Sequence, residues 1–220
     1  MKTNFPLIVG NIVNVKTFPF PVYVKVLEHI DGSDILTYRV EYVEAIIDAA
    51  NDLVSIGARA VVGACGSFAN YQTAISDQVA VPTFMSVMLQ VPLVMMGLRS
   101  DQTIGVLAFD KAAVTSHVFA ECGISEPERL RIYSTDAMEQ SIKLRAGDPT
   151  FSNEQFGDDL AEMSINIVED DPDVGAIVIQ CSELPPYAWK IQRATGLPVF
   201  DVNSLVTWAH QAAERQVYAG

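Results

Sequence analysis

The stretch VGAIVIQCSELPPYAWKIQRATGLPVFDV, residues 174–202, contains a strand pattern, a helix pattern and a second strand pattern in succession. VGAIVIQ (174–180) is almost entirely apolar, which is typical of a strand buried on both faces. PYAWKIQRATG (186–196) has helical spacing and ends at a glycine, and LPVFDV (197–202) returns to a strand pattern. Two strands joined by a helix form a parallel βαβ unit. Cys181 therefore lies where the first of these strands ends.

The same alternation of patterns runs through most of the chain. Further helices are expected at 41–57, 70–79, 89–100, 111–123, 153–171 and 203–216, and further strands at 59–65, 81–86, 102–110 and 129–135. Apolar strands that alternate with helices indicate an α/β fold with parallel-type sheets flanked by helices. No low-complexity linker divides the chain.

A second cysteine motif, GACGSFANYQ (63–72), repeats the first. Superposing Cys65 on Cys181 without gaps places Tyr71 on Tyr187, Ile75 on Ile191, Pro82 on Pro198, Phe84 on Phe200 and Leu89 on Leu205. We interpret the match as an internal duplication of a βαβ module. It predicts two similar lobes with pseudo-twofold symmetry and an active site between them: residues 1–98 and 200–220 with Cys65, and residues 99–199 with Cys181.

The composition restricts the partners of the protein. The chain has 220 residues and a formal net charge of −13, so it repels phosphate backbones and we expect no nucleic-acid binding. Three cysteines without disulfide spacing fit a reducing, cytoplasmic environment. Interruptions in the N-terminal apolar run and in the apolar segment 81–98 argue against a signal peptide and a membrane span. The surplus of apolar residues at 84–98 suggests a homodimer.

The positions of the two cysteines suggest chemistry. Each ends a parallel strand and precedes a helix, and ligands bind at that edge of a sheet. The N-terminus of a helix has free N–H groups and partial positive charge, which lower the pKa of a thiol. Two facing thiols can remove a proton from one face of a carbon beside a carboxylate and return one to the other face. Ser67, Ser182 and backbone N–H groups such as that of Gly66 would bind the carboxylate as it gains negative charge.

The two cysteine motifs resemble those of the aspartate/glutamate racemase superfamily, which includes hydantoin racemases, maleate isomerases and arylmalonate decarboxylases. CSELPPY (181–187) is especially similar to the second motif of that superfamily. The resemblance covers most of the chain and implies a cofactor-independent enzyme with a site between two lobes. NVKTFPFPV (14–22) resembles an asparagine–threonine loop of one uncharacterised branch, which implies that Asn14 and Thr17 bind the substrate; an ordinary polar turn is the alternative. The first strand of the superfamily is either replaced by PLIVGNIV (6–13) or missing.

The leading hypothesis is a racemase or epimerase of a small chiral carboxylate, an amino acid or hydantoin-like compound, with Cys65 and Cys181 as acid and base. A maleate-isomerase-like enzyme, an arylmalonate-decarboxylase-like enzyme and a non-enzymatic small-acid-binding protein are the alternatives. We expect no cofactor and no metal, because the three histidines show no metal-ligand spacing. Cys122 has no counterpart in the repeat and is expected to pack in the core, and Asp110 is expected to cap a helix.

Overall fold

The computed structural model describes residues 7–30, 32 and 34–215. The strands are β1 (Val61–Val62), β2 (Thr83–Phe84), β3 (Thr103–Ala108), β4 (Leu130–Ser134), β5 (Val174–Ile179) and β6 (Val199–Phe200). The α-helices are α1 (Val43–Ser55), α2 (Gln72–Ser76), α3 (Val91–Gly97), α4 (Ser116–Glu121), α5 (Glu139–Ala146), α6 (Asn153–Asp170), α7 (Ala188–Thr195) and α8 (Val202–Ala213). Short 3₁₀ helices join several of them; η3 (Gly66–Tyr71) and η7 (Pro185–Tyr187) are the two beside the cysteines.

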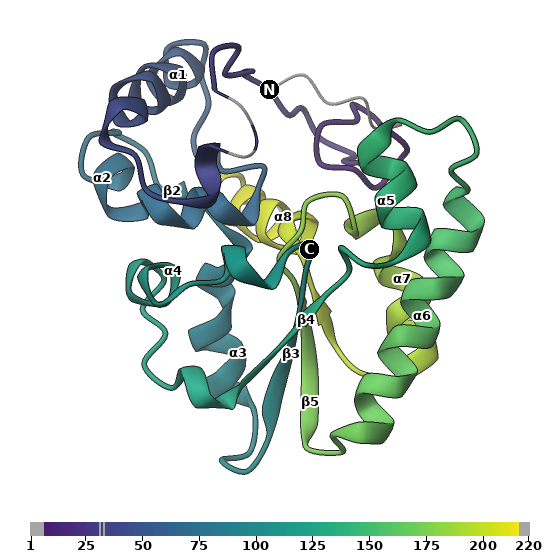
Figure 1. Cartoon of the computed structure of the whole chain (residues 1–220). Coiled ribbons are helices and arrows are strands. Elements are labelled where there is room, and N and C mark those ends of the chain that lie inside the picture. The colour runs from purple at the N-terminus through teal and green to yellow at the C-terminus, as the bar shows by residue number, and fades with distance from the viewer. Residues whose placement is uncertain (1–6, 31, 33, 216–220) are drawn as a thin grey trace, which may run out of the picture.

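The strands form two parallel sheets. One has four strands in the order β4-β3-β5-β6, and the other has the two strands β1 and β2. Helices α3 and α4 lie on one side of the larger sheet and α6 and α7 on the other, while α1 and α2 accompany the smaller sheet (Figure 1). The predicted α/β fold with parallel sheets flanked by helices is confirmed.

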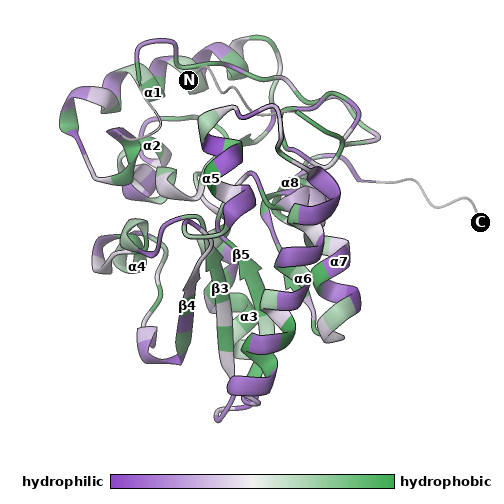
Figure 2. Ribbon diagram, turned by 45° about the vertical axis from the view of Figure 1, so that its right-hand side comes forward, coloured by the Kyte–Doolittle hydropathy of each residue, from purple (hydrophilic) through white to green (hydrophobic). Residues whose placement is uncertain are grey.

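The larger sheet is buried on both faces because its central strands are almost entirely apolar. Every residue of β3 and β5 is buried. Side chains alternate between two faces along a strand, so Val106 and Val178 pack with α3 and α4, whereas Leu107 and Ile177 pack with α6 and α7. Both strands are strongly hydrophobic, and α6 shows a polar outer side (Figure 2). This rigid sheet fixes the position of the residues that follow β5.

The internal repeat is visible in the strand pairing. Val61 pairs with Thr83 and Val62 with Phe84 in the smaller sheet, and Ile177 pairs with Val199 and Val178 with Phe200 in the larger one. These pairs superpose with the same offset that places Cys65 on Cys181. The prolines match as well, because the Pro82 carbonyl accepts from Val61 N at 3.0 Å and the Pro198 carbonyl accepts from Ile177 N at 2.9 Å.

The repeated side chains occupy equivalent core positions. Tyr71 directly precedes α2 and Tyr187 directly precedes α7, and both are buried. Ile75 and Ile191 are both fully buried. The repeated residues Tyr71, Tyr187, Ile75 and Ile191 therefore stabilise the two modules by packing.

The N-terminal region and the C-terminal elements bear on the first strand and on the expected lobes. The described residues 7–30 contain no strand, so PLIVGNIV does not replace the first strand of the superfamily in the described structure. β6 belongs to the four-stranded sheet, while α8 packs through Val202 and Val206 against Phe18 and Val62. The proposed lobes, 1–98 with 200–220 and 99–199, remain a prediction.

The structure also contains a helix that the sequence analysis missed. α5 (Glu139–Ala146) has few apolar residues, and they do not gather on one face, so periodicity gave no signal for it. Its Gln140 accepts a hydrogen bond from Ser152 N, 2.9 Å away, directly before α6. This contact between the two helix starts is a tertiary interaction.

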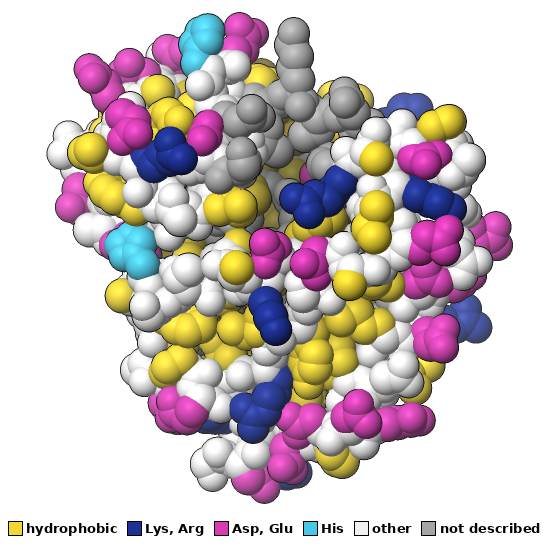
Figure 3. All heavy atoms as spheres, viewed as in Figure 1, with side chains coloured by type: hydrophobic (Ala, Val, Ile, Leu, Met, Phe, Trp, Pro, Cys, Tyr) yellow, Lys and Arg dark blue, Asp and Glu magenta, His cyan; other side chains and the backbone are white. Residues whose placement is uncertain are grey.

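The surface is acidic, as the composition requires. Asp and Glu side chains are spread over the face shown in Figure 3 and exceed Lys and Arg there. No helix within the described residues has both the length and the apolar character needed to cross a bilayer. Cys122 is buried in the core beside α4, and Asp110 accepts a hydrogen bond from Ala112 N at 2.8 Å as a helix cap, as predicted for both.

Candidate active site

The first cysteine connects β1 to a short helix. Cys65 has an extended backbone, with φ −133°, and directly precedes η3. Its side chain is partly buried and interacts with the backbone N–H and the hydroxyl of Ser67. Ser67 itself is buried. β1 ends at Val62, and Gly63 directly after it lies so close to the Met85 backbone that a side chain there would collide with it.

The second cysteine follows β5 in the same way. Cys181 is 8% exposed and belongs to the core between the larger sheet and α6 and α7. The backbone N–H groups of Glu183 and Leu184 interact with its sulfur. The turn continues into η7 and α7 because Pro185 and Pro186 suit the first turn of a helix.

The two cysteine motifs touch each other. A Cβ atom on Gly66 would lie 2.5 Å from Gln180 Nε2 and closer still to the Gln180 carbonyl oxygen. Gly66 follows Cys65 and Gln180 precedes Cys181, so the contact joins the two motifs directly. Negative charge on Cys65 raises the pKa of Cys181, which places the two sulfurs within electrostatic range.

Burial changes the expected acidity of both thiols. Desolvation is the largest effect on each, and it raises the pKa of Cys65 and of Cys181 above the usual value. The expectation that a helix N-terminus leaves both thiols with a lowered pKa is therefore wrong, because the N–H groups lower each pKa by less than desolvation raises it. η3 and η7 are short 3₁₀ helices, and their N–H groups offset only part of the desolvation.

Glu183 is a site residue that the sequence analysis did not identify. Asn11 Nδ2 donates a hydrogen bond to Glu183 Oε2 at 3.0 Å, and the Ser182 side chain also interacts with this carboxyl group. Burial raises the pKa of Glu183 to about 7. Its charge acts on both Cys65 and Cys181. The signal in the sequence was an acid inside the otherwise apolar and proline-rich CSELPPY motif.

The side chains of Asn14 and Thr17 are occupied within their own loop. Asn14 Nδ2 donates to Leu7 O at 2.5 Å, and Asn14 Oδ1 accepts from Lys16 N at 2.8 Å. Thr17 Oγ1 donates to Asn11 O at 2.6 Å and accepts from Gly10 N at 3.0 Å. These bonds favour the polar-turn interpretation over direct substrate binding, and through the turn they position Asn11.

The N-terminal loop is fixed against the second cysteine motif. Gly10 has φ +101°, and a Cβ there would lie 2.7 Å from Pro186 Cα. Asn203 of α8 donates a hydrogen bond from Nδ2 to Gly10 O at 2.7 Å. Glycine is therefore required at this position both by its backbone conformation and by the close approach.

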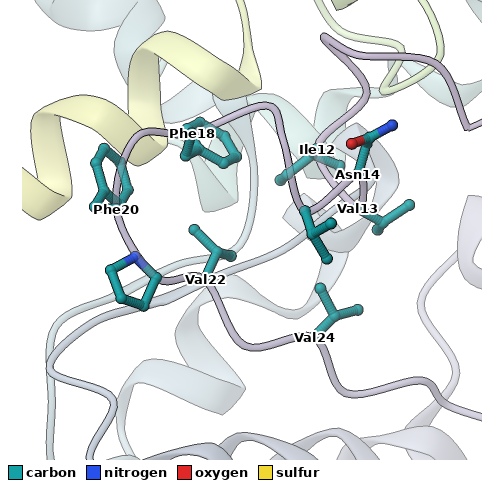
Figure 4. Close-up of a pocket in the computed structure, with 9 residues that line it drawn as sticks. Ile12, Val13, Asn14, Phe18, Phe20, Val22 and Val24 are labelled. Carbon is teal, nitrogen blue, oxygen red and sulfur yellow. The ribbon is translucent and has the colours of Figure 1, made fainter.

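A cavity of about 950 Å³ adjoins these residues. Asn11, Cys65, Phe68, Ser182 and Glu183 contribute to its wall, whereas Gly66, Ser67 and Cys181 are not part of it. It continues between α1 and α8 beneath the loop at 20–28. A smaller cavity of about 170 Å³ lies beside it, enclosed by the N-terminal loop, with Phe20 next to α8 (Figure 4).

Comparison with known proteins gives curated proteins of similar sequence and solved structures of similar fold. No family model matches the chain. Dimethylsulfoniopropionate lyase 5 of Emiliania huxleyi (strain CCMP1516) is 26% identical over 205 residues, which are 86% of this chain and 40% of the relative. A dimethylsulfoniopropionate lyase of Durusdinium sp. clade D is 24% identical over 149 residues, 66% of this chain and 49% of the relative. The chain thus spans less than half the length of these curated relatives.

The solved structures confirm the fold. Arylmalonate decarboxylase aligns with a TM-score of 0.54 at 16% identity, over 88% of this chain and 81% of its own. An aspartate racemase homologue from Pyrococcus horikoshii OT3 aligns with a TM-score of 0.57 at 16% identity, over 78% and 74%. The predicted fold is therefore confirmed, because the chain shares the fold of arylmalonate decarboxylase and of an aspartate racemase homologue.

Proposed function

We propose that this chain is a cofactor-independent lyase of the dimethylsulfoniopropionate lyase type, which removes the α-proton of a small carboxylate and expels a substituent from the β-carbon. The main support is the contact of the two cysteine motifs through Gly66 and Gln180 beside a cavity. The lyase names of the sequence relatives support elimination as the reaction.

The proposed reaction needs one base. A thiolate takes the proton from Cα, and the electrons of the C–H bond form the double bond between Cα and Cβ. The bond from Cβ to sulfur breaks, and its electrons leave with dimethyl sulfide. The products are acrylate, dimethyl sulfide and one proton held by the thiol, which then passes to solvent. We assign the base to Cys65, because it is the cysteine in the cavity wall.

The carboxylate of the substrate must be bound by hydrogen-bond donors, because negative charge flows onto it as the proton leaves. We assign this role to Ser182, which lines the cavity; Ser67 and the backbone N–H of Gly66, expected from the sequence to share it, lie outside the cavity wall. Burial raises the pKa of both thiols and so favours their protonated form near neutral pH. A positively charged substrate would lower these pKa values and favour the thiolate.

Racemisation is the second candidate, and the duplicated module favours it. Elimination requires one thiol, but the repeat supplies a cysteine in each half at equivalent positions. A carbon between them would be deprotonated from one face and reprotonated from the other. A cytoplasmic location and a homodimer remain predictions from composition.

One incubation distinguishes the candidates. In the first assay the protein is mixed with dimethylsulfoniopropionate in D₂O, and dimethyl sulfide is measured in the headspace and acrylate by NMR. In a parallel assay, a panel of chiral acids, amino acids and hydantoins is incubated with the protein in D₂O, and the incorporation of deuterium at Cα is measured. We expect equal amounts of dimethyl sulfide and acrylate, and none with the Cys65→Ser, Cys181→Ser double variant. Racemisation without elimination would establish the second candidate, and no proton loss from any compound would refute both.

A further inference from the structure

We propose that Glu183 is the counter-ion for a cationic group on the substrate, so that the substrate class is zwitterionic carboxylates with a sulfonium or quaternary ammonium group on the β-carbon. The inference deepens the proposed function and rests on it for the location of the site. It concerns binding, so its test does not depend on elimination.

The first argument is the absence of a protein cation. Glu183 lies in the cavity wall with its carboxyl group largely withdrawn from water. Among the described residues, no Lys, Arg or His forms an ion pair with it. A carboxylate in such a place is unfavourable unless a positive charge comes close to it. A cation in the cavity would supply that charge.

The second argument is the distribution of the cations that do line the cavity. Lys25 is paired with Asp52 of α1 at 2.5 Å. Arg59 precedes β1, whereas Cys65 follows the same strand, so the guanidinium belongs to the opposite end of β1 from the thiol. The wall beside the cysteines is therefore acidic. An anionic substituent would be repelled there and a cationic one attracted.

The third argument is the apolar part of the wall. Phe68 and Phe20 line the same cavity as Glu183. Methyl groups on a sulfonium or quaternary nitrogen are large and weakly hydrated, and aromatic faces bind such cations. An acid together with aromatic rings is thus more suitable for an alkylated cation than for a primary amine, which would need several hydrogen-bond acceptors.

Glu183 also has a structural role, which the test must distinguish from binding of the substrate cation. It accepts the hydrogen bond of Asn11 and so links the N-terminal loop to the second cysteine motif. Glu183→Gln keeps an oxygen that can accept this bond but removes the negative charge. Glu162→Gln removes an acid from an exposed position on α6 and serves as the matched control.

The test uses two carboxylates of nearly identical shape, 3-(trimethylammonio)propanoate and 4,4-dimethylpentanoate, which differ in having nitrogen or carbon at the branched centre. Titration calorimetry at pH 8 measures both dissociation constants. We expect the native protein and Glu162→Gln to bind the cationic probe at least about tenfold more tightly than the neutral one. In Glu183→Gln that preference should disappear, with the affinity for the neutral probe retained.

Three results would overturn the inference: equal affinity of the native protein for both probes, a preference that persists in Glu183→Gln, or no binding of either probe at millimolar concentration. If the protein preferred the cationic probe to the neutral one but released no dimethyl sulfide, the assignment of Glu183 as counter-ion would stand and only the proposed lyase activity would be refuted. The two failures are therefore distinguishable.

Discussion

Gly66 lies directly against Gln180, so the residue after the first cysteine contacts the residue before the second. Any side chain at Gly66 would collide with the Gln180 backbone as well as with its carboxamide. Gln180 N is itself fixed by a hydrogen bond to Leu107 O at 2.9 Å, at the end of the rigid larger sheet. The two cysteine motifs can therefore approach this closely only because residue 66 has no side chain.

Gly66→Ala tests this contact. The added methyl must displace the Gln180 backbone, so we expect a loss of about 1–3 kcal/mol in the free energy of unfolding. We expect the elimination activity to fall by a larger fraction than the free energy of unfolding does. Urea denaturation and the elimination assay measure the two effects. Gly97→Ala is the matched control, because no atom beyond its chain neighbours and its own helix backbone lies within 4 Å of its added Cβ, and alanine suits a helix. Equal stability of the two variants would contradict the close approach.

Substitutions of the three cysteines should have different effects on elimination and racemisation. Cys65→Ser is expected to lower kcat for elimination by about 10²–10⁴-fold, the usual contribution of a general base. Cys181→Ser should lower it less but should stop racemisation of any chiral substrate. With chiral substrates that carry a β-leaving group, the two variants should prefer opposite enantiomers. Cys122→Ser, in the core beside α4, should keep kcat. If Cys65→Ser retained native elimination, the assignment of the base would fail.

Glu183 should make folding stability depend on pH. Its folded pKa of about 7 lies above its usual value of 4.5, so its contribution is fully present below about pH 4.5 and is lost as pH rises through 7. The loss amounts to about 3 kcal/mol at most. Glu183→Gln should therefore gain stability relative to the native protein between pH 5 and 8, as measured by urea denaturation. A constant difference across this range would show that the carboxyl group is not desolvated.

The affinity for the cationic probe should rise with pH and level off above about pH 7, as Glu183 ionises. The other titratable groups that sense its charge are the thiols of Cys65 and Cys181 and the phenol of Tyr187, and burial raises the pKa of each. In the protein without probe they therefore stay neutral through this range. Calorimetry from pH 5.5 to 8.5 measures the effect, and a flat profile for the cationic probe would assign its binding to another group.

Activity should survive removal of metals. We expect unchanged turnover after dialysis against a chelator, and no pyridoxal absorbance in the purified protein, because the thiol mechanism needs neither. Recovery of activity only after a metal or pyridoxal phosphate is added would contradict this mechanism.

The sequence by itself determined the α/β class, the strands β3 and β5 and the repeat of the cysteine modules. These features depend on local patterns: continuous apolar strands, helical spacing and a fixed offset between equivalent residues. The same offset relates the pairing of Val62 with Phe84 in the structure to that of Val178 with Phe200. A local pattern is enough here because the order of elements in a βαβ unit restricts how the strands can pair.

The tertiary structure decided the chemistry of the site. Asn11 and Glu183 are 172 positions apart, and no local pattern indicates that they bond. The sequence left Asn14 and Thr17 open between substrate binding and a polar turn, and only the folded loop shows that their side chains bond to Leu7 O and Asn11 O. The acidity of the thiols depended on burial, because desolvation is set by all the neighbours that exclude water and outweighs the nearby N–H groups. A motif names the reactive groups, but their pKa values and partners come from segments distant in the chain.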